Sequence, residues 1–83
     1  MASVIDPQRH AHLIDLQRRV FEADAELEAY TGDDAEPLRE AVRQAVLAKD
    51  AALVETGLIE EHGHYIPRQD LKRAARDAGS SSG

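Results

Sequence analysis

Residues 13–30 read LIDLQRRVFEADAELEAY, and the apolar residues among them recur at alternating spacings of three and four. This period is the heptad pattern of a helix that presents one narrow apolar stripe to a partner helix. We therefore predict a long helix from Pro7 to about Tyr30, with Asp6 as its N-cap and Gly32 as the left-handed residue after its end. The stripe consists of Leu13, Leu16, Val20, Ala23, Leu27 and Tyr30.

A second helix is predicted over roughly residues 34–56. Asp33 and Glu36 have the spacing of a capping box, and Pro37 falls within the first turn, where its missing N–H is tolerated. Because the link from the first helix is short, the two helices should form an antiparallel hairpin.

The apolar residues of the second helix fall on two faces, so that one face can pack on the first helix while the other needs a partner. The first face carries Leu38, Val42, Ala45, Val46 and Leu53 and is interrupted by Lys49; the second carries Leu47, Ala51, Val54 and Leu58.

The chain after Gly57 changes pattern. Two short apolar runs flank Gly63, which predicts an extended turn or a short β-hairpin over about residues 58–66. Pro67 then opens a small C-terminal helix, on which Arg68, Lys72 and Arg76 recur every four residues. The predicted fold class is thus mainly all-α: a long αα-hairpin, a short extended segment and a small last helix.

One domain is expected over residues 1–78, because 83 residues are too few for two cores. Residues 79–83 read GSSSG, which is the composition of a flexible linker or a cloning remnant, and we place them outside the domain as a flexible tail.

The core of one chain should be small. Alanine supplies 14 of the 83 residues, and Val, Ile, Leu, Met and Phe together supply 19. Small scaffolds without disulfides commonly gain stability by oligomerising. We therefore expect a homodimer in a four-helix arrangement, and a second protein as a further partner.

The residues expected at the subunit interface are the larger members of the apolar faces, together with Phe21 beside the first stripe, whose ring would otherwise be exposed. They are Leu13, Leu16, Val20, Phe21, Leu27, Tyr30, Leu47 and Val54. In the alternative arrangement, the last helix and the 57–66 segment cover both faces within one chain.

Charge is distributed unevenly along the chain. Residues 1–61 carry 6 Lys/Arg against 14 Asp/Glu, whereas residues 62–83 carry 4 against 2. The hairpin should therefore have an acidic tip and a basic base. The tip holds Asp24, Glu26, Glu28, Asp33, Asp34, Glu36 and Glu40, and the base holds Arg9, His10, His12, Arg68, Lys72, Arg73 and Arg76.

Residues 53–66, LVETGLIEEHGHYI, resemble the end of a recognition helix that runs into the wing of winged-helix DNA-binding regulators. This resemblance implies a small transcriptional regulator, with Arg68, Lys72, Arg73 and Arg76 as the candidate DNA contacts. The sequence departs from the pattern at Glu60 and Glu61, where such wings usually carry Arg or Lys. Because phosphate binding depends on cations, a solvated basic face is the competing interpretation.

Catalysis, cofactors and metals are not expected. The chain has no Cys, and we find no phosphate-binding loop, nucleophile elbow or carboxylate pair in an apolar setting. His62 and His64 are the candidate metal ligands, with four surface histidines as the simpler interpretation. No long apolar run or signal peptide is evident, so we expect a cytoplasmic protein with neither membrane contact nor a small-molecule substrate.

Overall fold

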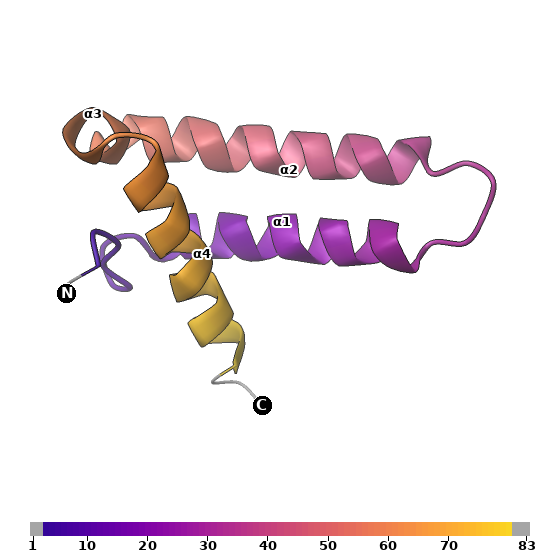
Figure 1. Cartoon of the computed structure of the whole chain (residues 1–83), viewed down its shortest axis with the longest axis horizontal. Helices are drawn as coiled ribbons and strands as arrows, with labels where there is room; N and C mark the ends of the chain where they lie inside the picture. Colours follow the sequence, from indigo (N-terminus) through magenta and orange to yellow (C-terminus); the bar gives the residue numbers. More distant parts are fainter. Residues whose placement is uncertain (1–2, 81–83) are drawn as a thin grey trace.

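The computed structural model describes residues 3–80, which form four helices and no strand. α1 (Ala11–Ala29) and α2 (Glu36–Glu55) lie antiparallel, joined by a loop at one end of the molecule (Figure 1). α3 (Leu58–His62) turns the chain, and α4 (Tyr65–Ser80) crosses α1 close to the end of the hairpin opposite the loop. The predicted helical hairpin and the last helix are confirmed.

The extended segment predicted over residues 58–66 is wrong, because the structure has α3 and the first turn of α4 there. Gly57, at φ 83°, lets the chain turn sharply after α2. In the helical turn that follows, Leu58 is buried and Ile59 packs against the core. A strand would point these two neighbours to opposite faces, so burying both favours the helix.

α1 begins four residues later than predicted. The Asp6 carboxylate accepts hydrogen bonds from the backbone N–H groups of Gln8 (2.9 Å) and Arg9 (3.4 Å), but these bonds close a separate turn over residues 7–10. They also lower the pKa of Asp6, because both N–H groups favour the ionised carboxylate.

The expected end of α1 and start of α2 also differ. Gly32 is not left-handed; the chain leaves α1 through Tyr30 in an extended conformation. The capping box is replaced by Asp34, whose carboxylate accepts the N–H of Glu36 at 3.1 Å. At the other end of the chain, α4 runs to Ser80, two residues into the predicted tail, and residues 81–83 lie outside the described part.

The core lies where the hairpin, the N-terminal segment and α4 meet. The backbone N–H of Val4 donates to Asp70 of α4 at 3.1 Å and fixes the N-terminal segment there. The buried apolar residues are Ile5, Leu13, Ile14, Leu53, Leu58, Leu71 and Ala75.

Candidate functional site

The residues predicted at the interface from α1 are largely covered by the chain itself. Leu13 is fully buried in the core with Leu53, so no surface of it is left for a second chain. Leu16, Val20 and Leu27 continue the same stripe and are half-buried. α1 packs against α2, so part of this stripe is covered within one chain, and an interface through Leu16, Val20 and Leu27 stays a prediction.

Phe21 and Tyr30 are placed differently. Phe21 packs against the core, and the Arg76 guanidinium of α4 lies 5.5 Å from the centre of its ring. This cation–π contact covers part of a ring that we expected a second chain to cover. Tyr30, at the end of α1, is 40% exposed.

The two predicted interface residues on α2 are open to solvent. Leu47 is 56% exposed and Val54 is 59% exposed. Seven residues separate them, which is close to two helical turns, so they lie on the same side of α2. Exposed Ala51 lies between them on that side. We call Leu47, Ala51 and Val54 the α2 stripe.

The α2 stripe is open to solvent. It is bordered by Asp50, whose carboxylate lies 3.7 Å from the Arg68 guanidinium of α4. In Figure 1, α2 forms one edge of the molecule, and α4 approaches the hairpin only near its α3 end. The exposure of Leu47 and Val54 agrees with this position of α2 at an edge.

Charged residues precede and follow the α2 stripe along the chain. One turn before Leu47, Arg43 pairs with Glu40, which also accepts a hydrogen bond from Gln44 at 2.8 Å. Beyond Val54, Glu60 and Glu61 are exposed on α3. An apolar centre between polar ends is the usual composition of a protein-binding surface.

The basic residues of α4 are mostly engaged with the chain itself. Arg68 lies beside Asp50, and Arg76 covers Phe21. Arg73 is largely exposed and lies 4.0 Å from Asp70, while Lys72 is half-buried. The wing implied by the winged-helix resemblance is helical here. DNA binding stays a prediction, and titration of a labelled duplex at two salt concentrations would test it.

A buried polar layer lies between the core and the rest of the hairpin, and the sequence analysis missed most of it. Gln17 is 1% exposed and Lys49 is 6% exposed; they lie one turn from Leu13 on α1 and one turn from Leu53 on α2. The Lys49 ammonium lies 3.1 Å from the Asp50 carboxylate. The signal in the sequence was the interruption of the apolar face by Lys49.

His62 and His64 are the candidate metal ligands. Within residues 3–80, no three His, Asp or Glu side chains lie close enough together to hold a metal ion. His62 lies 3.8 Å from Glu61, and His64 is exposed. The acidic residues of the predicted tip lie along the half of the hairpin near its loop, as expected from the antiparallel arrangement.

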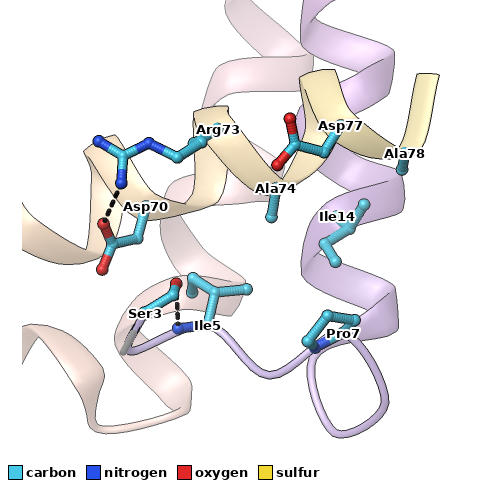
Figure 2. A pocket seen from close by; sticks show the side chains of 9 residues that line it. All are labelled: Ser3, Ile5, Pro7, Ile14, Asp70, Arg73, Ala74, Asp77 and Ala78. Atoms are coloured by element: carbon cyan, nitrogen blue, oxygen red, sulfur yellow. Dashed lines mark hydrogen bonds and ion pairs between the residues drawn. The ribbon is translucent and has the colours of Figure 1, made fainter. Parts of the chain in front are cut away.

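A cleft of about 410 Å³ separates the N-terminal segment from α4 (Figure 2). Ile5, Pro7, Ile14 and Ala74 line it, and Asp70, Arg73 and Asp77 lie along the α4 side. Asp70 is already paired with the N-terminal segment and with Arg73. Ser3 also lines the cleft, and its Oγ accepts a hydrogen bond from the Ile5 backbone N–H at 3.0 Å.

Comparison of the chain with protein-family models, with curated proteins and with solved structures gives no match. Among the described residues, no helix combines the length and the apolar character that a bilayer-spanning segment needs.

Proposed function

We propose that this chain is a non-catalytic association module that binds a second copy of itself through the α2 stripe. The observation that carries the proposal is the exposure of Leu47 and Val54, 56% and 59%, on one side of a helix whose other side is packed. Large apolar side chains grouped on one helix face are typical of a helix-docking surface.

The small core supports the same function. Seven apolar residues are buried in the described part of the chain, all near the α3 end of the hairpin. A second chain on α2 would add buried apolar surface to a molecule that has little of its own.

The contact should be weak. Covering the exposed parts of Leu47 and Val54 in both copies contributes on the order of 4 kcal/mol at about 25 cal/mol per Å². Losing the freedom of two separate chains costs at least about that much. We therefore expect the dimer to dissociate on dilution, and polar contacts at the ends of the α2 stripe to contribute to its affinity.

Sedimentation velocity over a range of concentrations tests the proposal. The wild-type chain should shift from monomer to dimer as its concentration rises, while Leu47→Glu and Val54→Glu should stay monomeric because a carboxylate in the contact would lose its hydration. Both side chains are more than half exposed, so neither substitution should unfold the monomer.

Ala41→Glu is the matched control. Ala41 is exposed on the same helix, six positions before Leu47, which places it about 120° around α2 and about 9 Å along it from Leu47. It adds the same charge outside the α2 stripe and should leave the dimer intact. A wild-type chain that stays monomeric at every concentration, or a dimer unaffected by both stripe variants, contradicts the proposed function.

A further inference from the structure

We infer that the cleft between the N-terminal segment and α4 binds a small organic cation, whose apolar body enters the cleft and whose ammonium group lies beside Asp77. The ligand class is a primary amine on an aromatic ring or a short aliphatic chain. No residue of the α2 stripe lines this cleft, so the inference does not depend on the proposed function.

The volume and the lining of the cleft suit a small molecule. Its volume is about 410 Å³, and small-molecule sites usually measure about 300–1,000 Å³. Ile5 and Ile14, which are 3% and 9% exposed, line it together with half-buried Ala74 (Figure 2). We call these three residues the floor of the cleft. An apolar group placed on the floor would leave water for contact with apolar side chains, which favours binding.

Both walls of the cleft are tied to the rest of the fold. On one side, the backbone N–H of Val4 donates to Asp70 at 3.1 Å, and the next residue, Ile5, is buried in the core. On the other side, Leu71 and Ala75 hold α4 in the same core. Because the cleft exists without a ligand, binding need not include the cost of ordering its walls.

The charges along the α4 side select a cation. Asp70, Arg73 and Asp77 lie there. The Arg73 guanidinium points toward Asp70, 4.0 Å away, and not toward Asp77 (Figure 2). Among residues 3–80, Asp77 has no ion-pair partner.

The uncompensated carboxylate adjoins the floor. Asp77 follows Ala74 by three positions on α4, and residues at this spacing are neighbours on a helix surface. A ligand with an apolar body and one positive charge would therefore be complementary to the floor and to Asp77 at the same time.

An NMR titration with three matched compounds tests the site. 2-Phenylethylamine, 2-phenylethanol and 3-phenylpropionate carry the same ring and two-carbon chain with a positive, a neutral and a negative end. We expect the amine to shift the amide signals of residues 3–6 and 70–78 until they saturate. It should bind about threefold more tightly than the alcohol, as an exposed ion pair allows, and the carboxylate should bind more weakly than either.

Two variants separate the contribution of the charge from that of the floor. Asp77→Asn should make the amine and the alcohol bind equally, whereas Asp24→Asn, at an exposed position of α1 outside the cleft, should keep their difference. Ala74→Leu should fill the cleft and abolish binding of the amine. The amide spectrum of each variant without ligand shows whether the fold is retained.

Shifts that do not saturate, or binding that Ala74→Leu leaves unchanged, would overturn the site. An amine that binds the wild-type chain no more tightly than the alcohol, or a difference that survives Asp77→Asn, would overturn the inferred cation.

Discussion

The two halves of the hairpin differ in how far they are buried. Near α3, the end of α2 and the start of α1 are covered by α4 and the N-terminal segment, and Leu13, Ile14 and Leu53 are buried. We call this half the base. Toward the loop, residues 18–29 of α1 and 36–48 of α2 contain no fully buried side chain. We call this half the arm.

The difference shows what a third layer contributes. Two helices side by side cover one strip of each other and leave the flanks of that strip in contact with water. In the base, α4 and the N-terminal segment cover these flanks; in the arm, α4 reaches the first turn, where Arg76 lies over Phe21. The base should therefore provide most of the folding free energy, and the arm should open at lower cost.

Truncation of one leucine in each half should give the largest effects and the clearest contrast. Leu53→Ala removes a fully buried side chain and should lower the free energy of unfolding by about 3 kcal/mol, because it leaves a cavity. Leu27→Ala in the arm, where the side chain is half-buried, should cost about 1 kcal/mol. Urea unfolding measures both, and equal losses would mean that the arm is as well packed as the base.

Replacement of Gln17 should change stability in the opposite direction. Its Oε1 atom is buried without a hydrogen-bond partner, which carries a desolvation cost. Gln17→Leu keeps a similar volume and should raise the free energy of unfolding by about 1 kcal/mol. A loss of stability in urea unfolding would show that the amide makes contacts that stabilise the boundary between base and arm.

The contact between Arg76 and Phe21 should make a smaller contribution to the free energy of unfolding than these side chains. Arg76→Gln removes the cation over the ring and should lower stability by about 0.5 kcal/mol, the usual size for a partly exposed pair. A double-mutant cycle with Phe21→Leu isolates the pair from the loss of each side chain alone. Additive losses in that cycle would exclude a direct contribution of the pair.

Asp6 should contribute a small stability that depends on pH. Its pKa is held below the ordinary value of 3.8, chiefly by the hydrogen bonds from Gln8 and Arg9. A depressed pKa in the folded state stabilises the fold above the unfolded value, and this stability is lost as the pH falls through the folded pKa. Asp6→Asn should therefore make the free energy of unfolding less dependent on pH in the acidic range. An NMR titration of the Asp6 carboxyl carbon that gives the ordinary pKa would contradict this interpretation.

The helical hairpin could be predicted because its signals are local. The alternation of threes and fours from Leu13 to Tyr30, together with Pro37 after a short link, specifies two helices and their antiparallel order. The two faces of the second helix also predicted that Leu47 and Val54 would need a partner, and the structure leaves them exposed.

The errors arose where tertiary contacts decide the local structure. Leu58 and Ile59 form a helical turn because both reach the core, which the alternation of residues in the sequence does not reveal. The partner of the α1 stripe could not be identified from the sequence, because a heptad stripe looks the same whether it packs on α2 or on another molecule. The buried amide of Gln17 carried no signal of its own.

Amide hydrogen exchange at two protein concentrations would test the central claim most directly. At high dilution, amides of the base should exchange most slowly and those of the arm faster. Raising the concentration into the dimer range should slow exchange most in α2, where the α2 stripe is covered. Exchange that does not depend on concentration, or that slows most in α4, would contradict association through the α2 stripe.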